Sequence, residues 1–512
     1  MGAINSPELN PLAPASYANF QGINTTRDKS SLDTGDQQFL LTLENGYANS
    51  QGVILRDRTL VARKDVPQNQ PIIHMNFFGR NLMAWAHREA GGISLRAEPN
   101  LSAPLAFTPG SVVTSTVFNN QIRFFSQGQQ MWDCSGSVFV RASNTKEKPA
   151  FGVACQQRLC VAGYADRPTV VELSRVNFPN IYSSDELKTD TTATRAIDID
   201  IRNLIGTTDF ITGLGVFEKS RLAVFTNDQC LIYNISPDFT KIAFDDKGAL
   251  SNGTISHNSI VSVGTDLIFA DRSGIRSVRR SESNGVTIYS VPLSEIVEEK
   301  YRDLYFRTPN KQSISGFYDH DYGQYHLFFP ISDYNTERLT VSIASAGSGV
   351  INKWSTGHYL NQRCGASFGG VTCIGTSGGI YEYVPSEDKT ATPDFIPDLT
   401  LITPILWHGD ITETKQARKF ILQASGTGHI DIEAFNNEGQ LLDAFKIDLD
   451  RPAEDDNGTH TIPLSEQYDR PFNFQYKGVQ FKMTASGGSG RIKIMGFAVL
   501  IEGKEPSKRS RK

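Results

Sequence analysis

The chain has 512 residues, of which 39% are hydrophobic and 21% charged, a balance typical of a globular protein with a sizeable core. Its formal net charge of −5 does not suggest a protein that binds nucleic acid over a broad basic surface, and it does not exclude a protein past which DNA slides. No apolar run approaches the ~20 residues that a membrane span needs. The N-terminal residues have neither the basic region nor the apolar core of a signal peptide, so we expect neither a membrane span nor export.

Residues 1–70 predict an extended arm followed by platform strands. Residues 1–36 are polar and proline-containing, with too few apolar side chains to fold alone, so we expect this arm to be ordered only against a partner. An apolar strand over 39–43 leads to Asn45-Gly46, a dipeptide that marks a tight hairpin turn. A second strand is expected over 52–61.

Residues 71–385 repeat one β-unit along their length. The stretch 214–237 shows the layout: an apolar strand, the tight turn Glu218-Lys219-Ser220, a second strand and turn, and a third strand. Similar units begin near residues 71, 112, 152, 214, 259, 313 and 363. Propeller blades recur at roughly 40–50 residues with four strands each, and a closed ring of blades leaves only short strand edges. The sequence therefore predicts an all-β fold built around a seven-bladed β-propeller.

Stacked β-sandwiches are the alternative architecture, since they also have short strands at regular spacing. Two observations favour the propeller. The strands recur in groups that keep the same order of strands and turns, and the range is too long for one sandwich.

Two segments interrupt the repeat. Residues 175–213 are polar and weakly patterned, and we expect a surface loop with one or two strands there. Residues 292–307 place apolar side chains on one helical face, with Ser294 as a candidate N-cap. This second segment predicts an amphipathic helix.

The chain after the repeat divides into three parts. Prolines and few core residues predict a linker over 386–405. Strands resume over 406–502, and the alternation at His429–Phe435 is typical of strands with one wet face, which predicts a C-terminal β-sandwich. Residues 503–512 are basic and predict a flexible tail.

No group of residues nominates a catalytic site. Thr376-Ser377-Gly378-Gly379 resembles the surroundings of a serine nucleophile, but no base is nominated, and a glycine-rich turn explains the string. Asp319-His320-Asp321 is a metal candidate, although a hairpin tip with solvated charges is the simpler interpretation. No pair among the 55 acidic residues can be singled out for glycoside hydrolysis. The six cysteines form no CxxC pair and predict buried free thiols. We therefore expect no catalytic residue, metal or cofactor.

An ordered series of short motifs runs along residues 40–385. Its members are Leu43-Glu44-Asn45-Gly46-Tyr47, Asn180-Ile181-Tyr182-Ser183-Ser184-Asp185, Ile197-Asp198-Ile199, Ile211-Thr212-Gly213-Leu214, Phe269-Ala270-Asp271-Arg272-Ser273-Gly274-Ile275-Arg276, the segment 318–330 and Val350-Ile351-Asn352-Lys353-Trp354. In this order the motifs resemble the tail nozzle proteins of short-tailed bacteriophages (podoviruses), also called tubular tail protein B or tail-hub proteins. An Arg-Pro-Gly common in the family is replaced here by Arg56-Asp57-Arg58.

The resemblance implies a structural virion protein without enzymatic activity. Six copies would form a ring below the portal and its adaptor protein, around a channel that carries genomic DNA out of the capsid. The C-terminal domain would contact tail fibres or tailspikes, and assembly would take place in the host cytoplasm. Loops at the distal end would gate the channel. The glycine-rich loop with Ala344, Gly347, Gly349 and Val350 is the candidate gate, with an ordinary connecting turn as the alternative.

Two other classes of protein remain open. A propeller that binds carbohydrate or hydrolyses glycosides would carry clustered carboxylates and tryptophans at the ring centre, whereas Trp85, Trp132, Trp354 and Trp407 are dispersed in sequence. A receptor-binding tail fibre would have a fibrous stem, and none is visible in the sequence.

Overall fold

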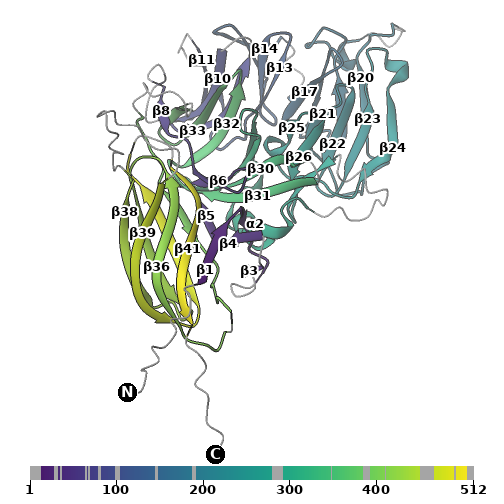
Figure 1. Ribbon diagram of the computed structural model, residues 1–512. Coiled ribbons are helices and arrows are strands. Elements are labelled where there is room, and N and C mark those ends of the chain that lie inside the picture. The colour runs from purple at the N-terminus through teal and green to yellow at the C-terminus, as the bar shows by residue number, and fades with distance from the viewer. Residues whose placement is uncertain are drawn as a thin grey trace, which may run out of the picture. The chain divides into compact units, whose positions relative to one another are not determined.

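The protein divides into two compact units (Figure 1). Unit 1 contains residues 1–61, 341–357 and 384–512, and unit 2 contains residues 62–340 and 358–383. The computed structural model describes residues 13–27, 33–34, 37–63, 66, 70–78, 82–98, 104–143, 148–186, 192–278, 292–346, 349–384, 393–409, 411–449, 466–488 and 492–503. Over these ranges the fold is nearly all β and made of many small sheets, as the sequence predicts. Within them no helix combines the length and apolar character that crossing a membrane requires.

Consecutive strands of unit 2 lie next to each other in a series of small sheets, except that β28, β29 and β30 are the first three strands of a 12-stranded sheet. We name each group of strands, and call it a sheet, by its first strand. The β9, β13, β17 and β21 sheets contain β9 (Ile72–Phe78), β10 (Leu82–Glu89), β11 (Gly92–Ala97), β12 (Leu105–Phe107); β13 (Thr114–Phe118), β14 (Gln121–Phe125), β15 (Trp132–Ser135), β16 (Val138–Arg141); β17 (Phe151–Cys155), β18 (Arg158–Ala162), β19 (Val170–Leu173), β20 (Ile197–Asp200); β21 (Ile211–Phe217), β22 (Arg221–Thr226), β23 (Cys230–Asn234), β24 (Ala243–Leu250). The β25, β28 and β32 sheets contain β25 (Val261–Val263), β26 (Asp266–Ala270), β27 (Ile275–Ser277); β28 (Ser315–Asp319), β29 (Gln324–Ser332), β30 (Asn335–Ala346); β32 (Gln362–Phe368), β33 (Val371–Thr376), β34 (Gly379–Tyr383).

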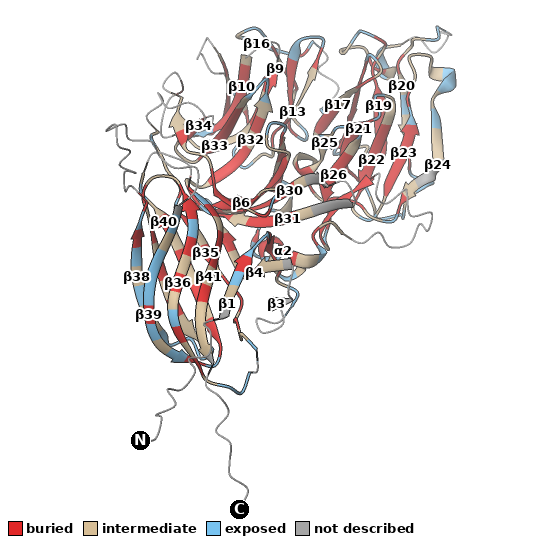
Figure 2. Ribbon diagram, in the orientation of Figure 1, coloured by how far each residue is buried: buried red, intermediate tan, exposed pale blue. Residues whose placement is uncertain are grey.

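The first strands of these sheets form a closed series. Each contacts the first strand of the next sheet, in the order β9, β13, β17, β21, β25, β28 and β32, and β32 contacts β9. Neighbouring sheets pack face to face through apolar side chains, which Figure 2 shows as buried strands. Leu173 and Leu214 belong to one such cluster between the β17 and β21 sheets, and Phe225 and Phe269 to the next. Both chain ends of unit 2 meet in the β32 sheet, where Arg63, directly after β8 (Leu60–Ala62), donates its N–H to Ile380 O at 3.0 Å.

Tight turns join the first two strands of several sheets. Asn119-Asn120 links β13 to β14 and Gln156-Gln157 links β17 to β18, with φ between 48° and 61°. Two consecutive residues with positive φ make a type I′ turn, whose twist matches that of paired strands. The turn predicted at Glu218-Lys219-Ser220 is confirmed between β21 and β22, with positive φ at its first two residues.

A buried arginine holds the segment that was expected to be a surface loop. Arg158 in β18 is fully buried, and its guanidinium donates to the carbonyl oxygens of Ser174 (2.8 Å), Arg195 (2.7 Å), Pro237 (2.7 Å) and Ser236 (3.3 Å). The described part of residues 175–213 contributes the predicted strand, β20, to the edge of the β17 sheet. The segment therefore belongs to the packed structure. The guanidinium of Arg158 binds carbonyl oxygens at both ends of its described part, at Ser174 and Arg195, and also those of Ser236 and Pro237.

A second arginine docks the motif at 180–185. Arg123 in β14 pairs with Asp133 in β15 and donates to Pro179 O (2.8 Å) and Asn180 Oδ1 (2.7 Å). Tyr182 is fully buried in the cluster between the β13 and β17 sheets. The motif thus joins two sheets.

The helix predicted over 292–307 is present as α2 (Glu298–Arg307), preceded by the 3-10 turn η4 (Glu295–Val297). Its buried face carries Tyr301, Leu304 and Tyr305, as the spacing predicts. Ser294 occupies the N-cap position of η4, as predicted, but its side chain does not cap the turn: its Oγ accepts the N–H of Ile275 in β27 at 2.9 Å.

The turn before β27 is built around one carboxylate. Asp271 Oδ1 accepts the N–H groups of Ser273 and Gly274 (2.7 Å for the latter), and Oδ2 accepts from Arg276 Nε. Tyr301 of α2 donates its hydroxyl to Asp271 O. The Asp-x-x-Gly-Ile-Arg motif therefore ties the helix to the β25 sheet.

Unit 1 assembles two sheets from distant parts of the chain. One has the order β39 (Glu466–Tyr476), β36 (Lys415–Ser425), β41 (Lys493–Gly503), β7 (Ile54–Arg56), β6 (Gly46–Ala48), with β1 (Ala13–Ala18) also paired to β41. The other includes β31 (Gly349–Gly357), β5 (Thr42–Glu44), β35 (Leu399–Ile402), β40 (Val479–Ser486), β37 (His429–Asn436), β38 (Leu441–Asp448) in this order, with β2 (Phe20–Ile23) joining β31 to β4 (Gln37–Leu40), which pairs with β3 (Asp33–Thr34).

Phenylalanine rings from both sheets fill the core of unit 1. The ring of Phe420 lies 5.6 Å from Phe497 and 5.6 Å from Phe472 in its own sheet. The same ring lies 5.7 Å from Phe445 and 5.3 Å from Phe481 in the other sheet. The alternation predicted over His429–Phe435 is confirmed, since Ile430, Ile432 and Ala434 are buried and their neighbours are not.

Two predictions about the ends of the chain need correction. The arm was expected to need a partner, yet β1 pairs antiparallel with β41 of the same chain, and Tyr17 stacks on Phe497 at 4.9 Å. Within the predicted linker 386–405, β35 lies between β5 and β40 in a sheet. Both segments carry buried apolar side chains that unit 1 covers. Residues 1–12, 28–32 and 35–36 of the arm and residues 504–512 of the basic tail lie outside the described residues.

The range predicted for the propeller, 71–385, also differs from the observed division. Residues 341–357 belong to unit 1, because β31 pairs with β5 there. The proposed gate loop falls in this stretch. Ala344 lies in β30, Gly349 and Val350 begin β31, and Gly347 is outside the described residues. Gating by this loop stays a prediction.

Candidate functional site

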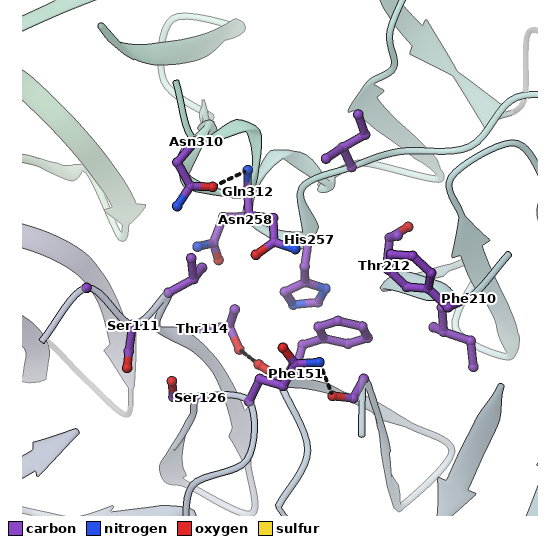
Figure 3. Close-up of a pocket in the computed structure, with 17 residues that line it drawn as sticks. Ser111, Thr114, Ser126, Phe151, Phe210, Thr212, His257, Asn258, Asn310 and Gln312 are labelled. Atoms are coloured by element: carbon purple, nitrogen blue, oxygen red, sulfur yellow. Dashed lines mark hydrogen bonds between the residues drawn. The ribbon is translucent and has the colours of Figure 1, made fainter. Parts of the chain in front are cut away.

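The starts of the first strands surround a hollow of about 280 Å³ in unit 2 (Figure 3). We call it the central hollow. It is lined by residues of 110–114, 126–127, 150–151, 163, 210–212, 255–258, 310 and 312. The lining comes from the segments at the starts of β13, β17, β21, β25 and β28, and from the ends of β14 and β18, so segments far apart in sequence meet here.

Phe151 and His257 form a stacked pair in the central hollow. Their rings lie 4.8 Å apart with an interplanar angle of 13°. Leu214 N–H donates to His257 Nδ1 at 3.2 Å, so the neutral imidazole carries its proton on Nε2. Desolvation lowers the pKa of His257 to about 3, and the ring stays neutral at physiological pH.

Amide side chains make up the polar wall of the central hollow. Asn258 Nδ2 donates to Val113 O at 3.0 Å, and Gln127 Nε2 donates to Gly163 O at 3.3 Å. Asn310 Oδ1 accepts the N–H of Gln312 at 3.1 Å. In each of the carboxamides of Asn258, Gln127 and Asn310, one polar atom is hydrogen-bonded to the backbone, and the other can bind a ligand. No Asp, Glu, Lys or Arg is among the described residues that line the central hollow.

A second hollow of about 430 Å³, the annex, shares Gly110, Ser111, Val112, Asn258 and Asn310 with the first. It contains the charged group Arg88, Asp333 and Arg363. Arg88 binds Asp333 at 2.7 Å and lowers the pKa of that carboxyl below its usual value, and Arg363 lies 3.7 Å from it. Among the described residues lining the two hollows, Asp333 is the one carboxylate, whereas glycoside hydrolysis needs two opposed ones.

The strings that resembled chemical sites in the sequence have structural roles. Thr376 Oγ1 accepts the N–H of Gly378 and donates to Gly379 O, both at 3.0 Å, so Thr376–Gly379 is the glycine-rich turn between β33 and β34. Asp319 Oδ1 accepts the N–H of Asp321 at 3.1 Å in the turn after β28. In the described part of the chain, no group of three or more His, Cys, Asp and Glu could hold a metal ion.

The cysteines are free and buried, as predicted. Burial raises the pKa of Cys134 and Cys155 to about 12, which keeps both thiols protonated and unreactive. Trp85, Trp132 and Trp354 are buried as well, and none of them lines either hollow.

Sequence reasoning did not find the central hollow. None of the candidate gate residues is among the described residues that line it, and Ala344, Gly349 and Val350 belong to β30 and β31. The residues that line it come from short loops before each sheet and share no spacing. The one available signal was the start of each repeat, since these starts meet at the centre of the closed series.

No family model and no curated relative matches the chain. Among solved structures, an exo-beta-1,3-galactanase from Phanerochaete chrysosporium matches 90% of this chain and 100% of its own at 9% identity, with a TM-score of 0.21. A protein from Bacteroides fragilis described as a 6-phosphogluconolactonase matches 66% of this chain and 91% of its own at 9% identity, with a TM-score of 0.32. An insecticidal delta-endotoxin from Bacillus thuringiensis matches 57% of this chain and 52% of its own, also at 9% identity, with a TM-score of 0.15. At these scores the likenesses carry no conclusion about the activity of this chain.

Proposed function

We propose that this protein is a structural component of a short-tailed phage virion, the tail nozzle, with no enzymatic activity. One observation carries the proposal: residues on which the family resemblance rests hold parts of the fold together. Asp271 and Arg276 tie α2 to the β25 sheet, Asn180 accepts from Arg123 of the β13 sheet, and Trp354 is fully buried in unit 1. Motifs of this kind specify a scaffold.

For the fold, we propose that the sheets of unit 2 are seven blades of a β-propeller. The closed series of first strands, the face-to-face packing of neighbouring sheets and the meeting of both chain ends in the β32 sheet support this interpretation. We propose that the two sheets of unit 1 form a β-sandwich, supported by the phenylalanine rings shared between them.

In the assembly, six copies would form a ring by heterologous contacts that close by rotation. The adaptor protein would lie above, fibres or tailspikes would attach outside, and genomic DNA would pass along the lumen. DNA that must pass freely should meet neutral or acidic walls, because each neutralised phosphate adds affinity through counterion release. The net charge of −5 is compatible with such walls.

Electron microscopy and mass measurement of the purified protein test the assembly. We expect six-fold rings, and six-fold density below the portal in particles. A stable monomer with no incorporation into particles would refute the proposal. Filter binding at low salt tests the conduit, because tight, salt-sensitive duplex binding by the ring would contradict a non-retaining lumen.

Residues 1–12 offer a second test of assembly. These residues precede β1 and contribute no strand to the described sheets. We therefore expect their removal to leave the fold intact and to weaken incorporation into particles. Removal of residues 1–23 is the contrasting variant, because it also takes β1 and β2 out of unit 1. Normal incorporation of the shorter truncation would remove the proposed role of the arm.

The competing function is a propeller that binds carbohydrate or hydrolyses glycosides. Hydrolysis is disfavoured because Asp333 is the one carboxylate among the described residues that line the two hollows, and it is bound by Arg88 with Arg363 3.7 Å away. Turnover of any aryl glycoside by the purified protein, abolished by Asp333→Asn, would favour the hydrolase over the structural protein. Binding of carbohydrate without hydrolysis is a separate question, and the chemistry of the central hollow supports it.

A further inference from the structure

We infer that the central hollow of unit 2 binds a neutral saccharide. This function goes beyond the assembly role and does not depend on it. The argument has three parts: the hollow is uncharged, its amides are fixed in place with free donors and acceptors, and an aromatic ring is exposed at its wall.

The absence of charge in the central hollow selects the class of ligand. Its described lining contains amide, hydroxyl and apolar side chains and one imidazole that stays neutral. An anionic or cationic ligand would find no side-chain counter-charge among the described residues that line the hollow. The nearest charges belong to the annex, where two arginines, Arg88 and Arg363, face one carboxylate, Asp333, and none of these three residues lines the central hollow.

The amides are preorganised for groups that both donate and accept. Asn258 and Gln127 use their N–H ends on backbone carbonyls, which leaves Asn258 Oδ1 and Gln127 Oε1 as acceptors. Asn310 uses its oxygen on the backbone of Gln312, which leaves Nδ2 as a donor, and the described structure gives the carboxamide of Gln312 no protein partner. Sugar hydroxyls can donate and accept at one atom, so neighbouring hydroxyls match such a mixed set.

Phe210 gives the hollow its exposed aromatic surface. The residue precedes β21, lines the hollow and is 40% exposed. Pyranose rings expose apolar C–H faces that pack on aromatic rings, while their hydroxyls reach polar groups at the edge. Figure 3 shows Phe210 on one side of the hollow and Asn258, Asn310 and Gln312 on another. A volume of about 280 Å³ is at the lower end of small-molecule sites, which suits one or two sugar rings.

Ligand-observed NMR on the full-length protein tests the inference, with neutral trisaccharides of glucose, galactose and mannose as probes and glucuronic acid as the charged comparison. We expect at least one neutral trisaccharide to bind with a Kd on the order of 0.1–1 mM. Asn310→Asp keeps the oxygen that accepts from Gln312 but replaces the Nδ2 donor with a charge, and should weaken binding at least tenfold. Phe210→Ala should weaken it by a similar factor.

Two variants outside the hollow serve as matched controls. Asn436→Asp changes an amide whose Oδ1 likewise accepts backbone N–H groups, those of Glu438 and Gln440. Phe368→Ala removes a phenylalanine that is 45% exposed, close to the exposure of Phe210. Neither control should change the Kd. Failure of every neutral trisaccharide to bind, stronger binding of glucuronic acid, or equal loss in the controls would overturn the inference, and none of these outcomes alters the test of assembly.

Discussion

Units 1 and 2 are both built from β-strands but are put together in opposite ways. In unit 2, strands that follow each other in sequence pair with each other, so most contacts within a sheet are local. In unit 1, one sheet draws on segments near residues 13–18, 46–56, 415–425 and 466–503. Local pairing costs little loop-closure entropy, whereas pairing of distant segments must bring long stretches of chain together first. One chain thus combines a unit whose sheets are formed mostly by consecutive strands with a unit whose sheets are formed by segments distant in sequence.

The two units also differ in what holds their interiors. Unit 1 depends on a cluster of phenylalanine rings between its sheets, centred on Phe420. Both units also have buried arginines: Arg56 in unit 1 donates to Gly487 O at 2.8 Å, whereas Arg158 and Arg338 in unit 2 each bind groups from several segments. We therefore expect truncation of Phe420 to act mainly on unit 1 and loss of Arg158 to act mainly on unit 2.

The largest expected effect is the loss of the ring at the centre of unit 1. Phe420→Ala removes contacts with rings of both sheets and should cost about 3–5 kcal/mol of unfolding free energy. Hydrogen exchange followed by mass spectrometry should show lost protection in β36, β40 and β41, with unit 2 unchanged. Phe306→Ala, at a position 73% exposed, is the control and should stay within about 0.5 kcal/mol. Equal loss of protection in both units would break the comparison.

Removal of the polar anchor of unit 2 comes next. Arg158→Met keeps much of the volume but leaves the carbonyls of Ser174, Arg195 and Pro237 without their buried donor, and should cost about 3 kcal/mol. Urea unfolding measures the loss, and hydrogen exchange should place it in β18, β19 and β20. Arg202→Met is the matched control, because that side chain is 72% exposed and its ion pair with Asp200 lies on the surface. A loss under 1 kcal/mol in Arg158→Met would show that the arginine is not an anchor.

Acid should weaken unit 2 more than unit 1. Burial lowers the pKa of His74 to about 4 and that of His257 to about 3 in unit 2, and that of His408 to about 4 in unit 1. The unfolded chain takes up protons below pH 6.5 while the folded imidazoles stay neutral, so stability is lost as pH falls from 6.5 towards 4. At pH 5 each histidine should cost about 1 kcal/mol, allowing for partial exposure.

The measurement for this prediction is the urea midpoint of each unit at pH 7.5 and pH 5, resolved by hydrogen exchange. His74→Gln should reduce the pH dependence of unit 2, and His408→Gln that of unit 1. If the two units lose stability equally, the difference in their buried histidines does not control their response to acid.

The smallest expected effect concerns a tight turn between consecutive strands of unit 2. Gln157 has φ of 61° in the turn between β17 and β18, a conformation that glycine adopts without steric cost. Gln157→Gly should therefore stabilise unit 2 by about 0.5–1 kcal/mol in thermal unfolding. Asn120→Gly, at the equivalent turn position with φ of 60°, should gain less, because asparagine already tolerates positive φ. Destabilisation by Gln157→Gly would show that the side chain outweighs the turn geometry.

Features that depend on neighbours in sequence were predictable. The turn at Glu218–Ser220, the buried face of α2 and the alternation of β37 follow from residue preferences and periodicity, which act over a few residues. The burial of the cysteines followed in the same way from their apolar surroundings. The side chain of Ser294 was predicted wrongly because its partner, Ile275, comes from a strand that local preference could not identify.

The sequence by itself determined that the chain is nearly all β, where its repeated units begin and where its helix lies, because short-range sterics and apolar spacing specify hairpins and helices. Tertiary structure alone decided which segments share a sheet: it joined β1 to β41, placed β35 between β5 and β40, and transferred residues 341–357 to unit 1. It alone also created the central hollow, from Phe151, Phe210, His257, Asn258 and Asn310. These residues carry no common motif because each is set by its own loop, and only the closure of the series of sheets brings them to one place.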